Sequence, residues 1–143
     1  MKILHWALGL IMAVSAGMAF ARGPVALMNF ENVAYKTSSG KKPNDTQMQQ
    51  AISRAGSLYQ WSTTPNGENK AVATVNVRGK HGVVVDISWN AETFSIIYKS
   101  SVNMDYADQA RGISMQSGPV IHPSYNKWVA SLRDSIQSEL SRL

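Results

Sequence analysis

The stretch from Ala71 to Tyr106 constrains the fold most, because it predicts three consecutive antiparallel strands. Apolar and polar residues alternate over 71–77 and again over 83–89, which is the period of two expected of a half-buried strand. The intervening RGKHG supplies two glycines for a tight hairpin turn. A second turn at 90–93 leads into a third alternating strand over 94–99. One face of this sheet is apolar and the other mixed, so we expect one face to be covered and the other to meet solvent.

Two amphipathic helices are predicted on either side of these strands. Asn44 or Asp45 caps the first, which should end near Tyr59 to Trp61, before the chain breakers of 62–67. Its apolar stripe comprises Met48, Ala51, Ile52, Ala55, Leu58 and Tyr59. The second helix runs from about Pro123 to Ser141. Its apolar stripe comprises Tyr125, Trp128, Val129, Leu132, Ile136 and Leu140.

The remaining segments complete the expected fold. Pro24 to Tyr35 has the composition of an additional edge strand, and Lys36 to Pro43 that of a loop. Ala107 to Val120 is a long connection without a clear period. The order is β-α-β-β-β-α, which predicts a single α+β domain over residues 22–143. We expect a two-layer sandwich in which both helices cover one face of an antiparallel sheet.

The first residues of the chain predict export. A short positive start at Met1-Lys2 precedes an apolar run from Ala7 to Phe20, and Ala19-Phe20-Ala21 fits the small-x-small rule for cleavage. We interpret residues 1–21 as a signal peptide cleaved after Ala21, rather than as a membrane anchor, because the apolar run is short for a span. The expected location is the bacterial periplasm, without a transmembrane span after cleavage.

Composition narrows the classes of ligand and partner. After cleavage, 13 Lys and Arg against 9 Asp and Glu leave a charge of +4, against +5 for the whole chain. In the periplasm such a charge meets envelope components rather than nucleic acid, so the expected partner is an envelope protein or a small anionic ligand. The chain has no cysteine, which excludes disulfides and thiolate chemistry. His81 and His122 alone are too few for a zinc site, so we expect no metal and no cofactor.

One cluster of polar and aromatic side chains is a candidate binding site. The last predicted strand ends in polar residues over 97–106, and the last helix begins with His, Tyr, Asn and Trp over 121–128. If the helix starts near the end of that strand, six side chains converge there: Ser101, Asn103, Tyr106, His122, Tyr125 and Asn126. The alternative is structural, with the polar residues capping the helix and the aromatic residues filling the core edge. The basic tip of 78–81 is interpreted as a solvated turn.

The same two segments carry a resemblance. They read I-x-Y-x-x-S-x-N-(apolar)-x-Y and I-H-x-x-Y-N-x-W, with matching positions at Tyr98, Ser101, Asn103, Tyr106, His122, Tyr125, Asn126 and Trp128. From about Val25 to the C-terminus the chain resembles a family of small uncharacterised exported bacterial proteins, many of them lipoproteins. The chain lacks the modified cysteine of the lipoprotein members. The resemblance implies the fold and an envelope location, and it implies no reaction.

Three functions are compatible with these patterns. The first is a non-enzymatic binding or accessory protein of the envelope, because the sequence has no Gly-x-Ser-x-Gly elbow and no Gly-rich phosphate loop, although its serines and aspartates leave a Ser-His-Asp arrangement open. The second is a small hydrolase or transferase with His122 as general base and Ser101 or Tyr125 nearby. The third is a structural or envelope-stress protein that self-associates through an exposed strand edge, such as Pro24 to Tyr35.

Overall fold

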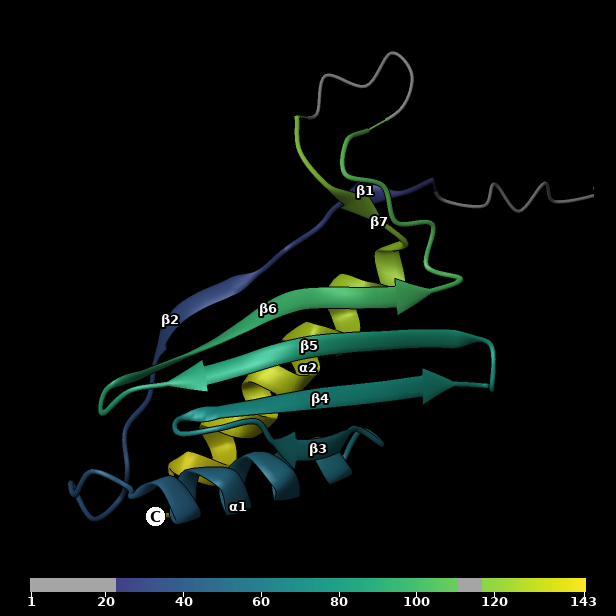
Figure 1. The fold of residues 1–143 in the computed structure, drawn as a ribbon. Helices are drawn as coiled ribbons and strands as arrows, with labels where there is room; N and C mark the ends of the chain where they lie inside the picture. The colour runs from purple at the N-terminus through teal and green to yellow at the C-terminus, as the bar shows by residue number, and fades with distance from the viewer. Residues whose placement is uncertain (1–22, 111–116) are drawn as a thin grey trace, which may run out of the picture.

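The computed structural model describes residues 23–110 and 117–143, and the predicted signal peptide lies outside them. The described chain is α+β, with a five-stranded antiparallel sheet and two helices (Figure 1). In chain order the elements are β1 (Val25–Ala26), β2 (Phe30–Ala34), α1 (Asp45–Ser57), β3 (Ser62–Pro65), β4 (Lys70–Val77), β5 (His81–Trp89), β6 (Thr93–Val102), β7 (Val120–Ile121) and α2 (Pro123–Leu140).

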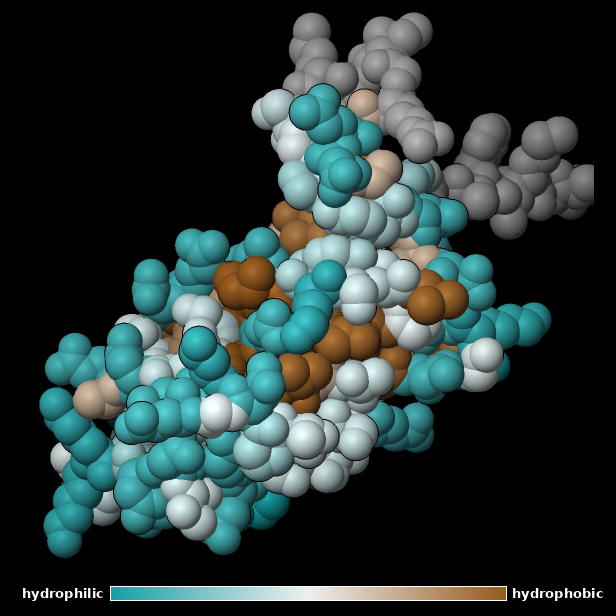
Figure 2. Space-filling model, in the orientation of Figure 1, coloured by the Kyte–Doolittle hydropathy of each residue, from teal (hydrophilic) through white to brown (hydrophobic). Residues whose placement is uncertain are grey.

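The three strands predicted between Ala71 and Tyr106 are confirmed as β4, β5 and β6. The sheet has the order β2-β6-β5-β4-β3, and every neighbouring pair is antiparallel. On one face nine apolar side chains are buried: Ala71, Ala73, Val75, Val83, Val85, Ile87, Trp89, Phe94 and Ile96. The opposite face is mixed, as the alternation predicts. Figure 2 shows apolar side chains gathered over the middle of this open face with hydrophilic ones around them.

Both helices begin where the sequence predicts. Asn44 caps α1 in a capping box, in which its side chain accepts from the Gln47 N–H and the Gln47 side chain accepts from the Asn44 N–H. Pro123 opens α2, with His122 as its N-cap. The buried faces of the two helices join the strand residues in one core. In Figure 1, α2 runs behind the sheet and α1 lies at its lower end beside β3.

The predicted end of α1 is wrong, and so is the loop predicted after it. The helix ends at Ser57, so Leu58 and Tyr59 leave its apolar stripe and are 68% and 50% exposed. The backbone then turns sharply, and Gln60 adopts a φ of 64°. The residues predicted as chain breakers form β3, which pairs with β4 along the edge of the sheet. A short polar strand that contains proline has the composition of a loop, which is why the pattern misses it.

The segment from Pro24 to Tyr35 contains strand, as predicted, but it forms two strands instead of one. These strands, β1 and β2, pair with different partners. Within β2, Asn32 has a φ of 52°, and the register against β6 shifts between Phe30 and Val33. β1 instead pairs with β7 in a separate two-stranded sheet. The predicted order β-α-β-β-β-α therefore lacks three strands of the observed order. Within the connection predicted over 107–120, Ala107 pairs with Val120, and residues 111–116 lie outside the described part.

Gly56 gives a test of how α1 ends. A Cβ built on Gly56 lies 3.1 Å from Thr63 Cγ2 and 3.2 Å from Trp61 Cβ. Alanine normally stabilises a helix by about 1 kcal/mol relative to glycine. We expect Gly56→Ala to lower the free energy of unfolding by about 1–3 kcal/mol instead, because the methyl group overpacks the turn.

Thermal unfolding measures this as a loss of several degrees in melting temperature. The control is Ser53→Ala at an exposed position of the same helix, where the added propensity meets no neighbour. A Gly56→Ala protein as stable as the wild type would contradict the close packing of the turn that follows α1.

Candidate functional site

The end of β6 and the start of α2 meet, as the candidate cluster requires. The backbone N–H of His122 donates to the backbone oxygen of Met104 at 2.7 Å, and the Met104 side chain is buried. This bond places the first turn of α2 beside the residues that follow β6. The six candidate side chains nevertheless separate into different environments.

Ser101 and Tyr106 belong to an aromatic group centred on Tyr98. The hydroxyls of Tyr98 and Ser101 are 2.9 Å apart, within hydrogen-bond distance, and the rings of Tyr98 and Tyr106 stack with centroids 4.5 Å apart. The Tyr106 hydroxyl donates to Asp108 Oδ1 at 2.8 Å, and this bond is the main cause that raises the pKa of Tyr106. These polar groups are therefore satisfied by their neighbours.

Tyr125 is a core residue. Its side chain is fully buried, and its ring meets that of Tyr98 edge-on at 5.7 Å. Burial, and then the neighbouring Tyr98, raise the pKa of Tyr125. Its hydroxyl has no hydrogen-bond partner in the described part of the chain. The hydroxyl thus stays protonated at neutral pH and does not act as a base.

Asn126 connects α2 to the N-terminal segment. Its Oδ1 accepts from the Met28 N–H at 3.0 Å, and its Nδ2 donates to the Ala26 oxygen at 2.9 Å. Both groups of the amide are used in holding the chain around β1 against the helix. Asn126 accordingly has a structural role in this fold.

Asn103 orients His81 at the tip of the β4–β5 hairpin. The side-chain Nδ2 of Asn103 donates to the backbone oxygen of Lys80 at 2.8 Å. The backbone oxygen of Asn103 lies 2.8 Å from Nδ1 of His81. A carbonyl oxygen only accepts, so Nδ1 of His81 must carry the hydrogen. The remaining ring nitrogen, Nε2, is then an acceptor in the neutral imidazole.

His122 has the opposite tautomer. Its Nδ1 accepts from the Ser124 N–H at 3.1 Å, as an N-cap side chain does, so this nitrogen carries no hydrogen. In the neutral imidazole the hydrogen is on Nε2, which is therefore a donor. The two rings lie 6.2 Å apart between centroids. The turn at 78–81 thus contacts the start of α2, which the sequence interpretation did not foresee.

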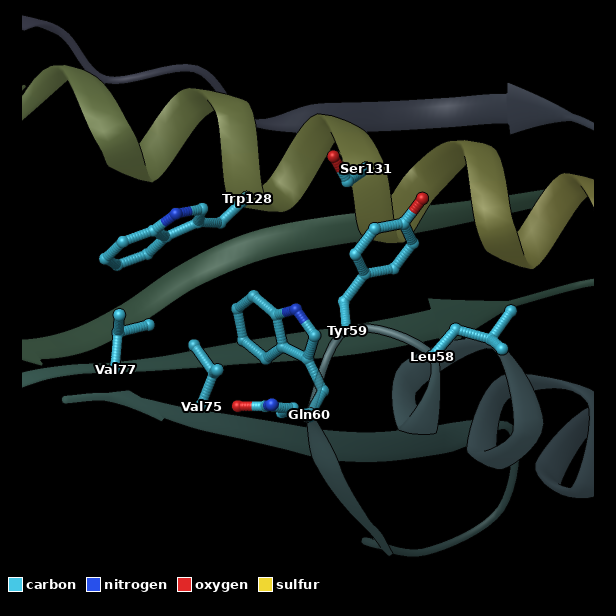
Figure 3. Close-up of a pocket in the computed structure, with 8 residues that line it drawn as sticks. Leu58, Tyr59, Gln60, Val75, Val77, Trp128 and Ser131 are labelled. Atoms are coloured by element: carbon cyan, nitrogen blue, oxygen red, sulfur yellow. The ribbon is translucent and has the colours of Figure 1, made fainter. Parts of the chain in front are cut away.

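Two hollows flank the middle of α2 and share Val77 and Trp128. One, of about 430 Å³, is lined by Val77, Arg78, His81, His122, Ser124 and Trp128. The other, of about 320 Å³, is lined by Leu58, Tyr59, Gln60, Trp61, Val75, Val77, Trp128 and Ser131. Figure 3 shows the second hollow, with Trp128 over Val77 and the Tyr59 ring reaching toward α2. We call the two together the α2 groove, with a polar end at His122 and an apolar end at Leu58.

Of the six candidate residues, only His122 lines the α2 groove. Asn103 acts on the groove through His81, and the others face the core, β1 or the Tyr98 group. The sequence interpretation did not place Arg78, His81 and Trp128 in one site. A glycine-containing turn with an arginine and a histidine was the only signal that bears on it, and a solvated turn has the same signal.

The described residues contain neither a metal-binding cluster nor a membrane-spanning helix. Among residues 23–110 and 117–143, no group of three or more His, Cys, Asp or Glu side chains is arranged to hold a metal ion. In the same described residues, neither helix has the length and apolar character needed to cross a membrane.

Comparison with known proteins places the chain in no family. No protein-family model, curated protein or solved structure matches it. The resemblance to small exported bacterial proteins therefore stays a prediction, and function has to be argued from the geometry.

His122 gives the second testable prediction. His122→Ala removes the acceptor for the Ser124 N–H, and we expect it to lower the free energy of unfolding by about 1 kcal/mol. His122→Asn retains a capping side chain without the imidazole, so it should recover most of that loss. Thermal unfolding of the two variants beside the wild type separates capping from any other use of the ring. Equal losses in both would contradict the capping role.

Tyr125 gives the third testable prediction. Because its buried hydroxyl has no partner in the described structure, Tyr125→Phe should leave the melting temperature unchanged or raise it. Tyr125→Ala is the control, and removal of the ring from the core should cost about 3–5 kcal/mol. A clear loss of stability in the phenylalanine variant would show that the hydroxyl has a partner after all.

Proposed function

We propose that the protein is a non-enzymatic binding protein of the bacterial cell envelope that holds a small ligand in the α2 groove. The proposal takes the fold as a two-layer sandwich with one covered and one open sheet face. The envelope location rests on the predicted signal peptide over residues 1–21. The observation that carries the proposal is that two hollows adjoin along α2, with Val77 and Trp128 in the lining of both.

The lining of the groove supports a binding role. Ligand sites are concave and mostly apolar, with a few polar groups that set the orientation of the ligand. The α2 groove has two tryptophans and two valines along its length, and Arg78 and two imidazoles at one end. Leu58 and Tyr59 are the most exposed large apolar residues near it, at 68% and 50%. Their exposure has no structural explanation within the fold and suits contact with a ligand.

The alternative of a hydrolase or transferase has less support. A general base needs a hydroxyl within hydrogen-bond reach. Nδ1 of His122 is used in capping α2, the Ser101 hydroxyl bonds to Tyr98, and the Tyr125 hydroxyl is buried without a partner in the described chain. Neither Ser101 nor Tyr125 therefore pairs with His122 as nucleophile and base.

Self-association through a strand edge also has less support. At one edge, Gln137 Nε2 donates to the Ala34 oxygen, and the Arg133 guanidinium lies 4.4 Å from the centroid of the Phe30 ring. At the other edge, β3 is four residues long and ends in Pro65. Irregular register, proline and side-chain cover are features that oppose pairing between edges.

Binding of an amphiphilic fluorescent probe tests the proposal. We expect the wild-type protein, expressed from the full chain, to bind 8-anilinonaphthalene-1-sulfonate saturably, with fluorescence enhancement as the readout. Trp128→Ala should weaken this binding about tenfold or more, because the wall shared by both hollows is lost.

Val102→Ala is the matched control. Val102 is 64% exposed, at the open end of β6 beside Gly82 and away from the groove lining. Its substitution should leave probe binding unchanged. If Val102→Ala weakened binding and Trp128→Ala did not, the probe would be on the open sheet face and the proposal would be wrong.

A further inference from the structure

The polar end of the α2 groove has a positive charge without an internal counterion. Arg78 lines the hollow beside His81 and His122. All nine Asp and Glu residues of the chain fall within the described residues, and none of them forms an ion pair with Arg78. A guanidinium that lacks a partner in a hollow beside apolar walls is free to bind an anion from outside.

Arg78 occupies a backbone position that opposes arginine. Three residues, 78–80, connect the paired positions Val77 and His81. The N–H of Lys80 donates to the Val77 oxygen at 3.2 Å, which closes a turn whose central residues Arg78 and Gly79 have φ of 56° and 66°. Such a type I′ turn favours Asn-Gly, because asparagine tolerates a left-handed backbone and larger side chains do so at a cost. Arginine at this position therefore costs local stability relative to asparagine.

Residues with a positive φ that are not glycine, Asn or Asp occur in both hollows of the α2 groove. Among the described residues, six that are not glycine have a positive φ, and four of these are Asn or Asp: Asn32, Asn69, Asn103 and Asp105. The two exceptions, Gln60 and Arg78, both line the α2 groove. Strained backbone of this kind concentrates at functional sites, where the surrounding structure holds it in place.

The histidines complete the recognition of an anion. Nε2 of neutral His122 is a donor, because its Nδ1 is held as an acceptor by Ser124. His81 keeps its hydrogen on Nδ1, so Nε2 of its neutral ring is an acceptor and adds no donor for the anion. With both rings neutral, the end of the groove has one full positive charge and one additional donor. This arrangement suits a monoanion such as a carboxylate, because a phosphate monoester has a charge near −2 at neutral pH.

The length and lining of the rest of the groove indicate a hydrocarbon chain. From His122 to Ser131 the groove follows α2 for about 14 Å, at 1.5 Å per residue. Val75, Val77 and Trp128 face it along this length. A bound peptide would need a partner for each backbone N–H and C=O, and this lining of apolar side chains offers few. An acyl chain needs none.

From these observations we propose that the ligand is a single-chain anionic amphiphile of the fatty-acid class. Its carboxylate lies at Arg78 and His122, and its chain passes Trp128 toward Leu58. The inference rests on the proposed binding function and adds to it the identity of the two ends of the ligand. The exposed position of Leu58 leaves the chain end open to solvent, so the site accepts chains of more than one length.

Arg78→Asn tests this inference, because it changes stability and binding in opposite directions. The substitution creates an Asn-Gly turn, and the melting temperature should rise by about 2–5 °C. Binding of dodecanoate, measured by calorimetry below the concentration at which micelles form, should weaken at least tenfold. Binding of dodecanol, which has the same chain without the charge, should not change. Dodecyl phosphate should bind the wild type no more tightly than dodecanoate does.

Lys80→Asn is the matched control, because it removes the same charge from the same turn at a position that does not line the groove. It should leave dodecanoate binding within about twofold of the wild type. Equal binding of dodecanoate and dodecanol by the wild type would overturn the carboxylate site and leave the groove as a binding site. Binding of neither would overturn the proposed function as well. Tighter binding of dodecyl phosphate, or equal losses in Lys80→Asn and Arg78→Asn, would also overturn the inference.

Discussion

The α2 groove depends on one short segment, Asn103 to Asp105, which leaves the regular path of β6. Asn103 and Asp105 both have a positive φ, a conformation that Asn and Asp tolerate better than other residues do. Asn103 bonds to the β4–β5 hairpin tip through both its side-chain amide and its backbone oxygen. The backbone oxygen of Met104 accepts from the N–H of His122, the N-cap of α2. Because this segment holds the hairpin on one side and the helix on the other, it sets the distance between the two walls of the groove.

The parts of the fold that could be predicted are those determined by local pattern. The alternation of β4, β5 and β6 and the capping box of α1 depend on residues near one another in the chain. The parts that were missed depend on contacts between distant segments. α1 stops at Ser57 because Gly56 packs against the chain that returns as β3, and both Tyr59 and Trp61 donate backbone hydrogen bonds to its oxygen. A periodic stripe that continues to Tyr59 contains no sign of this turn.

The candidate site was predictable in position and not in detail. Polar residues at the end of one strand and the start of the next helix indicated that the two ends meet, which the bond from His122 to Met104 bears out. The direction in which each side chain points could not be predicted from the sequence. Asn126 is four residues from His122 and contacts the chain around β1 instead of the groove. Arg78 and His81 come from a turn more than forty residues earlier in the sequence, and only the hairpin and Asn103 bring them to the same place.

In the proposed site, contacts within the protein hold the two imidazoles and the backbone of Arg78 in place. The capping bond fixes His122, and the backbone oxygen of Asn103 fixes His81. The turn closed by the bond from the Lys80 N–H to the Val77 oxygen fixes the backbone of Arg78. A ligand that meets groups already in place does not lose the free energy of ordering them. The free energy of ordering these groups lowers the stability of the fold instead. Arg78 has a strained backbone, and the N-cap of α2 is a histidine rather than the more favourable Ser, Asp or Asn. The strained Arg78 and the His122 N-cap each weaken the fold locally, and each places a hydrogen-bond donor at the polar end of the α2 groove.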